Sequence, residues 1–215
     1  HKFIFQYYAQ KMEDKINNFM AQIEGDYHFE VIEIEPGEAH KNIETCTQVW
    51  KALSELDADR KSVLINLGGG VITDLGGFVA STFKKPIDFI NVPTTLLSMV
   101  DASVGGKTGV DLGPLKNQIG VINQPVMVLI VTDFLKTLEE RQLQSGFAEM
   151  LKHGLIRDKE YWYALKKVTE FHTLDNLIYH SVIIKNQVVL QDPTEQNLRK
   201  SLNFGHTLGH AIESY

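Results

Sequence analysis

The sequence of 215 residues contains one cysteine, Cys46, and therefore no pair that could form an internal disulfide. A chain of this length buries enough surface to fold without such bridges, and a lone thiol favours a reducing, cytoplasmic compartment. No apolar run approaches the roughly 18 residues of a membrane span, and no signal peptide opens the sequence. The formal net charge of −6 argues against a nucleic-acid-binding protein, which usually carries an excess of basic residues. These absences predict a soluble protein that acts on small molecules.

The first half of the sequence alternates short apolar runs with amphipathic stretches. Residues 62–67 form an apolar run that stops at three glycines, as a strand buried in a parallel sheet would. The same reasoning predicts strands at 30–34, 87–92 and 126–131 and helices at 39–56 and 74–83. Strands interleaved with helices predict an α/β sheet.

The second half carries helical patterns and no comparable strand. We expect helices at 138–157, 159–167, 174–191 and 202–214. The change of character predicts two domains, an α/β domain over 1–138 and a helical domain over 139–215, with the functional site between them.

Glycine-rich segments are the first chemical signal. Gly68-Gly-Gly-Val-Ile-Thr-Asp74 follows an expected strand and precedes an expected helix, where backbone N–H groups can approach a pyrophosphate. Its spacing is not that of the dinucleotide fingerprint, and a tight turn is the alternative interpretation. A second segment, residues 101–108, ends in Gly-Lys-Thr but lacks the first glycine that a P-loop requires, which argues against a P-loop nucleotidase.

A polar pattern closes the sequence. Asn203, His206 and His210 stand three and four residues apart, so on one helix they would share a face. Imidazoles at this spacing can hold zinc, although a catalytic zinc usually has three protein ligands. A solvated polar helix face is the alternative.

A carboxylate with suitable neighbours lies upstream. Glu149, Lys152 and His153 fall on one face of the expected helix. An exposed ion pair within the helix is the alternative, but the flanking residues are apolar and predict burial. A buried glutamate and lysine need partners such as a metal or a substrate anion.

Taken together, these segments resemble the 3-dehydroquinate synthase family. The resemblance rests on long motifs in the family's order, at residues 36–41, 68–78, 92–97, 100–108, 115–117, 134–138, 146–152 and 202–213. It covers the chain from about residue 36 to its end. It implies a Rossmann-like, NAD-binding α/β domain followed by an all-α metal- and substrate-binding domain.

The resemblance also implies an activity. Members convert 3-deoxy-D-arabino-heptulosonate 7-phosphate to 3-dehydroquinate and phosphate, in the shikimate pathway of aromatic amino acid biosynthesis. Bound NAD transiently oxidises a ring hydroxyl, which permits elimination of phosphate, and takes the hydride back before an aldol closure. Zinc, which cobalt can replace, polarises that hydroxyl. The expected partners are the anionic sugar phosphate and a second copy of the chain in a homodimer, with no nucleic acid and no membrane.

The family's roles carry over to matching positions. The resemblance implies NAD contacts by Glu38, Lys41, Gly69, Gly70, Val71, Asp74, Thr94, Thr95, Lys107, Lys116, Phe134, Thr137 and Leu138. It implies zinc ligation by Glu149 and His206. It implies catalytic roles for Asp101, Lys107, Lys152, Asn203 and His210, and substrate contacts by Asn117, Lys185, Arg199 and Lys85. Arg199 and Lys185 would hold the carboxylate, because Arg grips a carboxylate with two parallel hydrogen bonds.

Three departures from the family pattern keep alternatives open. The third zinc-binding histidine of the family follows the Asn-Phe-Gly-His segment and would fall beyond Tyr215. No Asp-x-Asn motif ends an expected first strand, and Lys85 stands where the family has an arginine that reaches a neighbouring subunit. The sequence is therefore expected to be incomplete. The alternatives are an inactive fragment that still binds NAD, and a related sugar-phosphate cyclase with another substrate.

Overall fold

The computed structural model describes residues 2–8, 28–171, 174–206, 209 and 212. The chain divides into two compact units. The first consists of His1–Thr94 and Gly106–Val131, and the second of Thr95–Gly105 and Thr132–Tyr215. The second unit therefore contains residues 95–105, which the sequence analysis assigned to the α/β domain, and begins again at Thr132 rather than at 139.

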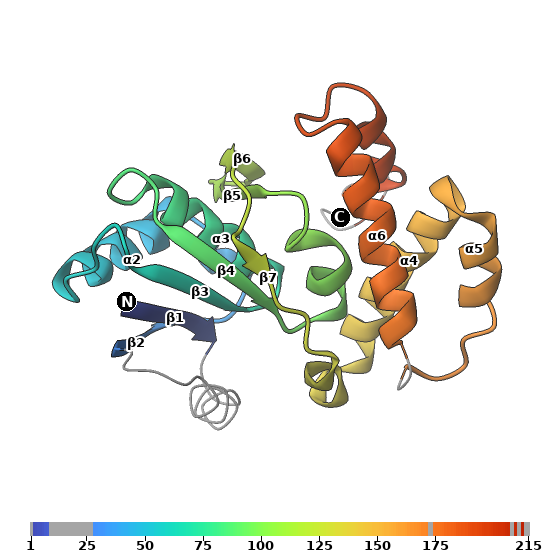
Figure 1. Cartoon of the computed structure of the whole chain (residues 1–215), viewed down its shortest axis with the longest axis horizontal. Helices are drawn as coiled ribbons and strands as arrows, with labels where there is room; N and C mark the ends of the chain where they lie inside the picture. Colours follow the sequence, from blue (N-terminus) through green and yellow to red (C-terminus); the bar gives the residue numbers. More distant parts are fainter. Residues whose placement is uncertain (1, 9–27, 172–173, 207–208, 210–211, 213–215) are drawn as a thin grey trace. The chain divides into compact units, whose positions relative to one another are not determined.

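The first unit is built on a five-stranded parallel sheet in the order β2-β1-β3-β4-β7 (Figure 1). Its strands are β1 (Lys2–Tyr8), β2 (His28–Ile34), β3 (Val63–Gly68), β4 (Asp88–Pro93) and β7 (Met127–Val128). Five of the six residues of β3 are buried, as expected for a strand covered on both faces. The α/β interpretation is confirmed, although β1 was not predicted and β7 is shorter than expected.

Two helices pack on this sheet, α2 (Ile43–Glu55) and α3 (Gly70–Thr82). The core between them and the strands contains fully buried side chains such as Leu53, Leu64 and Leu75. Helix α2 begins at Ile43, later than expected, because the Asn42 side chain accepts the Thr45 N–H at 2.9 Å and caps the helix. A 3₁₀ turn, Glu38–His40, precedes it. Helix α3 begins four residues earlier than expected, at the last of the three glycines.

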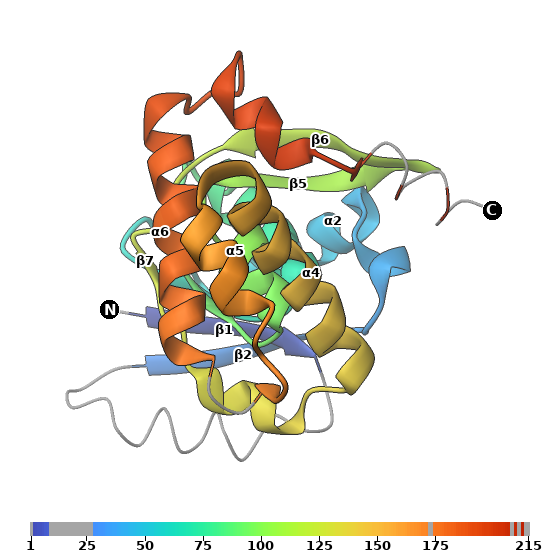
Figure 2. The same ribbon diagram turned by 90° about the vertical axis from the view of Figure 1, so that its right-hand side faces the viewer.

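An antiparallel hairpin also belongs to the first unit and was not predicted. It pairs β5 (Lys107–Leu112) with β6 (Leu115–Ile122), side by side in Figure 2. The strands meet at Gly109 and Gly120, where a Cβ on Gly109 would lie 2.6 Å from the Ile119 carbonyl oxygen. Gly113 turns the chain with φ of +57°. Most of β6 is exposed, so it lacks the apolar pattern on which the sequence reasoning depended.

The second unit is helical, as expected. Its longer helices are α4 (Glu140–Arg157), α5 (Lys159–Leu165) and α6 (Asp175–Gln191), which Figure 2 shows face on. Shorter pieces are the π-helix Ser98–Ala102 and the 3₁₀ helices Thr132–Thr137 and Leu198–Asn203. The π-helix packs against α4 and α6. Among the described helices, none combines the length and apolarity that crossing a membrane demands.

The expected helix over residues 202–214 is wrong at its start. The 3₁₀ helix ends at Asn203, Phe204 leaves the helical region, and Gly205 has φ of +83°. The Gly209 N–H then donates to the Gly205 carbonyl at 3.0 Å, so helical bonding restarts beyond the break. Asn203 and His206 therefore do not share one helical face. His210 lies outside the described residues.

Candidate functional site

In the first unit, the candidate site lies where β3 and β4 end. The Thr94 N–H donates to the Gly68 carbonyl at 2.9 Å, which holds the two strand ends together. Gly69 is the N-cap of α3 and supplies no side chain to the amide groups of the first turn, where Gly70 and Val71 lie. This edge of a parallel sheet, with an open helix N-terminus, can accept a pyrophosphate group.

A buried lysine of the same unit, Lys41, is itself a predicted site residue and contacts two others. Lys41 is 4% exposed, and its Nζ donates to Asp74 Oδ2 at 2.6 Å and to Asn117 Oδ1 at 2.7 Å. Asn117 adopts φ of 54°, and its N–H donates to Asp111 Oδ1 at 2.7 Å. The structure thus places Asn117, predicted for the substrate, against two residues predicted for NAD.

The other predicted residues of the first unit are exposed. Glu38 lies in the 3₁₀ turn before α2, Lys107 begins β5, and Lys116 lies on β6. Lys85 follows α3 in a left-handed conformation with φ of 64°. Their assignment to the cofactor and substrate stays a prediction.

Four residues predicted for the NAD pocket belong to the second unit. The Thr95 hydroxyl accepts the Ser98 N–H at 3.2 Å and lies 2.9 Å from the Ser98 hydroxyl, so it caps the segment that leads into the π-helix. Phe134, Thr137 and Leu138 lie in or directly after the 3₁₀ helix Thr132–Thr137. Their role in binding NAD also stays a prediction.

Asp101 is presented by the π-helix, in which the Ser103 N–H reaches back five residues to the Ser98 carbonyl at 3.1 Å. Lys185 of α6 is 6% exposed, and its ammonium group donates to both the carboxylate and the backbone carbonyl of Asp101. Burial alone would raise the pKa of Asp101. The adjacent Lys185, with smaller contributions from Lys152 and His153, instead lowers the pKa to about 2.

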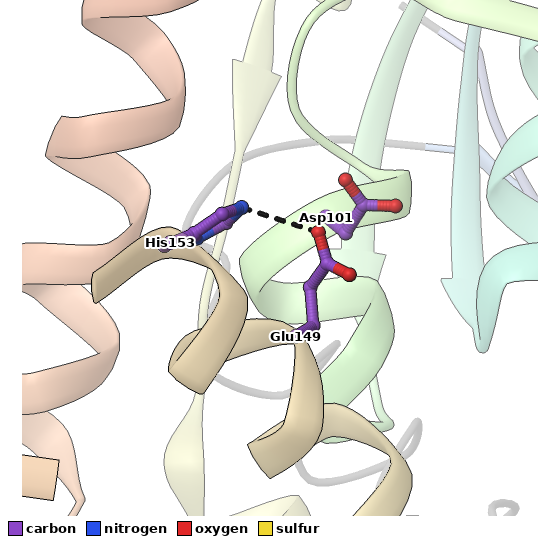
Figure 3. A group of neighbouring side chains, drawn as sticks. All are labelled: Asp101, Glu149 and His153. Carbon is purple, nitrogen blue, oxygen red and sulfur yellow. Dashed lines mark ion pairs between the residues drawn. The ribbon is translucent and has the colours of Figure 1, made fainter. Parts of the chain in front are cut away.

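Helix α4 contributes the other half of this cluster. Its buried stripe has the spacing of a helix face and includes two ionisable residues, Glu149 at 8% exposure and His153 at 0%. Glu149 Oε1 lies 2.7 Å from Lys152 Nζ and 3.2 Å from His153 Nε2. Figure 3 shows the side chains of Glu149 and His153 directed at each other, with Asp101 beside them. One potential ligand atom from each of the three residues lies within 4.8 Å of the others. The predicted face of α4 is confirmed, and it is buried.

Lys152 connects Glu149 to the segment that follows the 3₁₀ helix. Its Nζ lies 3.4 Å from His206 Nε2 and donates to the Leu202 carbonyl. One ammonium group therefore contacts both residues predicted to bind zinc. A carboxylate and an imidazole around one cation form a donor set that suits zinc or cobalt.

Arg199 is fixed inside the second unit. It is 2% exposed, and its guanidinium donates to the carbonyls of Pro193 at 2.7 Å and Gly105 at 2.8 Å. The Asp192 carboxylate accepts three backbone hydrogen bonds, from the N–H groups of Arg199 at 3.0 Å, Gln196 and Asn197. Those hydrogen bonds lower the pKa of Asp192 against the opposing effect of burial. Burial lowers the pKa of Arg199, and neighbouring carboxylates raise it in part.

Asn203 lies beside this loop rather than beside Glu149. Its amide donates to Glu195 Oε1 at 2.5 Å. The sequence reasoning missed Asp192, for which the Asp-Pro pair after α6 was a usable turn signal. It placed His153 on the face of Glu149, with a position beside the zinc only as a minor alternative, and it missed Ser181, which lies 2.7 Å from His153 across two helices.

Comparison with known proteins agrees with this architecture. A family model for the N-terminal part of 3-dehydroquinate synthase matches residues 31–145, and one for its C-terminal part matches residues 146–215. The chain belongs to the 3-dehydroquinate synthase family. The 3-dehydroquinate synthase of Parabacteroides distasonis is 47% identical over 188 residues, which is 86% of this chain and 53% of that protein. The chain thus spans about half the length of this curated relative.

Two solved structures of sugar-phosphate cyclases resemble the fold. A 2-deoxy-scyllo-inosose synthase complexed with carbaglucose-6-phosphate, NAD⁺ and Co²⁺ has a TM-score of 0.88 and 27% identity, over 99% of this chain and 61% of that one. The 2-epi-5-epi-valiolone synthase of Streptomyces hygroscopicus, with NAD⁺ and Zn²⁺ bound, has the same TM-score and identity, over 99% of this chain and 62% of that one. The expected fold is confirmed. The expectation that this chain is shorter than its relatives is also confirmed.

Proposed function

We propose that the protein from which this chain derives is a 3-dehydroquinate synthase, which converts 3-deoxy-D-arabino-heptulosonate 7-phosphate to 3-dehydroquinate and phosphate with NAD and a zinc or cobalt ion. The observation that carries this proposal is the position of Lys152, whose ammonium group contacts both Glu149 and His206. A cationic position shared by a carboxylate and an imidazole is what a metal site of this family requires.

The residues present fit the metal. Glu149 Oε1 is buried, lies 2.7 Å from the Lys152 ammonium group, and makes no hydrogen bond of good geometry among the described residues. An ionised carboxylate with an open lone pair can bind a divalent cation in place of the ammonium group. Glu149 and His206 would hold the ion.

The first unit fits NAD. The N-terminus of α3 offers backbone N–H groups without side-chain caps, while Lys41 and Asp74 form a nearly buried pair in the same unit. When bound, NAD supplies the transient oxidation and the metal polarises the hydroxyl that is oxidised. The chain's own residues position these groups and balance their charge.

Buried cations of the second unit fit an anionic substrate. Lys185 and Arg199 are at most 6% exposed, and each already donates to fixed acceptors, so their charges are held in place. We assign the substrate carboxylate to these two residues. Lys152, which is tied to Glu149 and the Leu202 carbonyl, is placed to move a proton beside the metal. Asp101, Lys107, Asn117, Asn203 and His210 would complete the substrate contacts.

A homodimer and a cytoplasmic location belong to the same proposal. In a dimer, Lys85 would reach the phosphate site of the neighbouring subunit in place of the family's arginine. Lys85 is exposed, so its side chain is accessible to a partner. Sedimentation of the full-length protein tests the dimer.

The test is release of inorganic phosphate by the full-length protein with NAD and zinc. We expect release from 3-deoxy-D-arabino-heptulosonate 7-phosphate and none from glucose 6-phosphate, which lacks the carboxylate. Release from glucose 6-phosphate alone would favour a related cyclase. NAD binding without release from either would favour the inactive fragment. In the same assay, Glu149→Gln should lose phosphate release because it removes a proposed metal ligand. Glu140→Gln, an exposed substitution of the same type on α4, is its matched control and should keep phosphate release.

A further inference from the structure

We propose that His153 is a positioning residue that orients Glu149 toward the metal, and that Ser181 holds the His153 ring in the orientation needed for this. The inference rests on the metal site of the proposed function. It assigns His153 no place among the ligands.

The geometry joins three buried side chains on two helices. His153 on α4 and Ser181 on α6 are each 0% exposed. His153 Nδ1 lies 2.7 Å from Ser181 Oγ, and Nε2 lies 3.2 Å from Glu149 Oε1. Figure 3 shows the ring of His153 directed at the carboxylate of Glu149. Such a chain restricts the orientation of a metal-binding carboxylate, because turning the ring would break its contact with Ser181 and move Nε2 away from Glu149.

The Glu149 carboxylate, rather than the surroundings of Ser181, determines the tautomer of His153. A serine within a helix commonly donates to the carbonyl four residues earlier, which here belongs to Leu177. The Tyr161 hydroxyl already donates to that carbonyl at 2.7 Å. A carbonyl oxygen can accept two hydrogen bonds, and the Tyr161 hydroxyl also interacts with the Ser181 hydroxyl, so these contacts do not fix the ring proton. The Glu149 carboxylate beside Nε2 can only accept, which favours the ring proton on Nε2 and leaves Nδ1 to accept from the Ser181 hydroxyl.

That tautomer suits the carboxylate. With its proton on Nε2, His153 places an N–H group 3.2 Å from Glu149 Oε1, an electrostatic attraction whose geometry falls short of a hydrogen bond. The opposite tautomer would set a nitrogen lone pair against a carboxylate lone pair, with both atoms buried and neither hydrogen bonded with good geometry among the described residues. The Nε2–H form avoids this repulsion.

A metal bound directly by Asp101, Glu149 and His153 is the competing interpretation, since one ligand atom from each lies within 4.8 Å of the others. Two ammonium groups stand against it. Lys185 is bonded to the Asp101 carboxylate, and Lys152 lies 2.7 Å from Glu149 Oε1. A dication among these three donors would lie close to both ammonium groups, whereas a metal between Glu149 and His206 needs to displace Lys152 alone.

The test measures metal affinity directly. Zinc and cobalt are titrated into the full-length protein in competition with a chromophoric chelator, for the unmodified chain and for His153→Leu, His153→Gln and Ser181→Ala. We expect His153→Leu to weaken binding about 10- to 100-fold, the usual effect of losing such a partner. His153→Gln, whose amide can still donate, should recover most of the affinity, and Ser181→Ala should lose several-fold.

Controls separate positioning from folding and from ligation. His180→Gln changes another histidine of the same unit, paired with Asp158 at 2.8 Å, and should leave metal affinity unchanged. Circular dichroism and thermal unfolding confirm that each variant is folded. The visible spectrum of the cobalt-loaded His153→Gln variant should match that of the unmodified chain, because the ligand set is the same.

Two results would overturn the inference. Affinity unchanged in His153→Leu would show that His153 has no role at the metal. A cobalt spectrum in His153→Gln that indicates loss of a nitrogen ligand would make His153 a ligand. Absence of metal binding by the unmodified chain would instead overturn the proposed function, and the inference with it.

Discussion

The candidate sites of the two units are built from different kinds of group. In the first unit, the candidate nucleotide site consists largely of backbone: a glycine turn, the ends of two parallel strands, and a helix N-terminus without a side-chain cap. In the second, the candidate metal and anion site consists of buried ionisable side chains, among them Glu149, His153 and Lys185. The candidate nucleotide site therefore depends on close approach of the backbone, and the candidate metal and anion site depends on buried charge.

This difference separates the effects of substitution. Added volume should damage the first unit, where helices and strands approach closely at glycine. Altered charge should damage the second, where each buried charge has a named partner. The following predictions test that division, from the largest expected effect to the smallest.

Removing the Glu149 charge should have the largest effect. Glu149→Gln keeps the shape of the side chain but loses the anionic ligand, so zinc affinity should fall by more than about 100-fold, beyond the range of a positioning residue. Chelator competition and zinc analysis after dialysis measure this. Full zinc occupancy in the variant would remove Glu149 from the ligand set.

Added volume in the first unit should destabilise the fold. A Cβ at position 76 would lie 1.9 Å from Oδ1 of the buried Asn66. The side chain of Asn66 is held in place, because its Nδ2 donates to Asn91 Oδ1 at 2.9 Å. Gly76→Ala should therefore lower the free energy of unfolding by about 2–3 kcal/mol. At Gly209, an added Cβ meets none of the described residues within 4 Å, so Gly209→Ala is the control. Equal unfolding midpoints for both variants would argue against the close packing.

The second unit should lose stability in acid through Asp101. Its pKa of about 2 lies below the ordinary value, so its contribution is complete above about pH 4 and is lost as the pH falls toward 2. The contribution is at most about 2 kcal/mol. Denaturant unfolding at several pH values should show the advantage of the unmodified chain over Asp101→Asn shrinking across this range. A constant difference would contradict the lowered pKa.

Substitution of Lys41 should have the smallest effect, and it tests whether the candidate NAD site and the candidate metal site act independently. Lys41→Met leaves Asp74 and Asn117 without their shared donor, so NAD affinity should fall about tenfold, as expected for one charge-assisted hydrogen bond. Zinc affinity should not change. Isothermal titration with each ligand measures both, and a loss of zinc affinity would show that the two sites do not act separately.

The sequence predicted elements whose burial leaves a pattern. Residues 62–67 form an apolar run because β3 is buried, and Glu149, Lys152 and His153 share a face because α4 is regular. The hairpin was missed because β6 is mostly exposed and has no alternation to detect. The expected helix over residues 202–214 is interrupted at Gly205, which has a positive φ. A glycine permits this conformation but also occurs within helices, so the sequence alone does not predict the interruption.

Contacts between distant segments were beyond sequence reasoning. Ser181 lies 28 positions from His153, and nothing near either residue indicates that α4 and α6 place them 2.7 Å apart. The same holds for Lys41 and Asn117, 76 positions apart. Family resemblance supplied Glu149 and His206 as ligands, and the structure supplied the ammonium group that contacts both.

A crystal structure of the zinc-loaded full-length protein, with anomalous scattering recorded at the zinc edge, tests the central claim most directly. The account predicts zinc bonded to Glu149 and His206, with Lys152 displaced and His153 hydrogen bonded to Glu149 but not to the metal. Zinc bonded to Asp101 and His153 would contradict it.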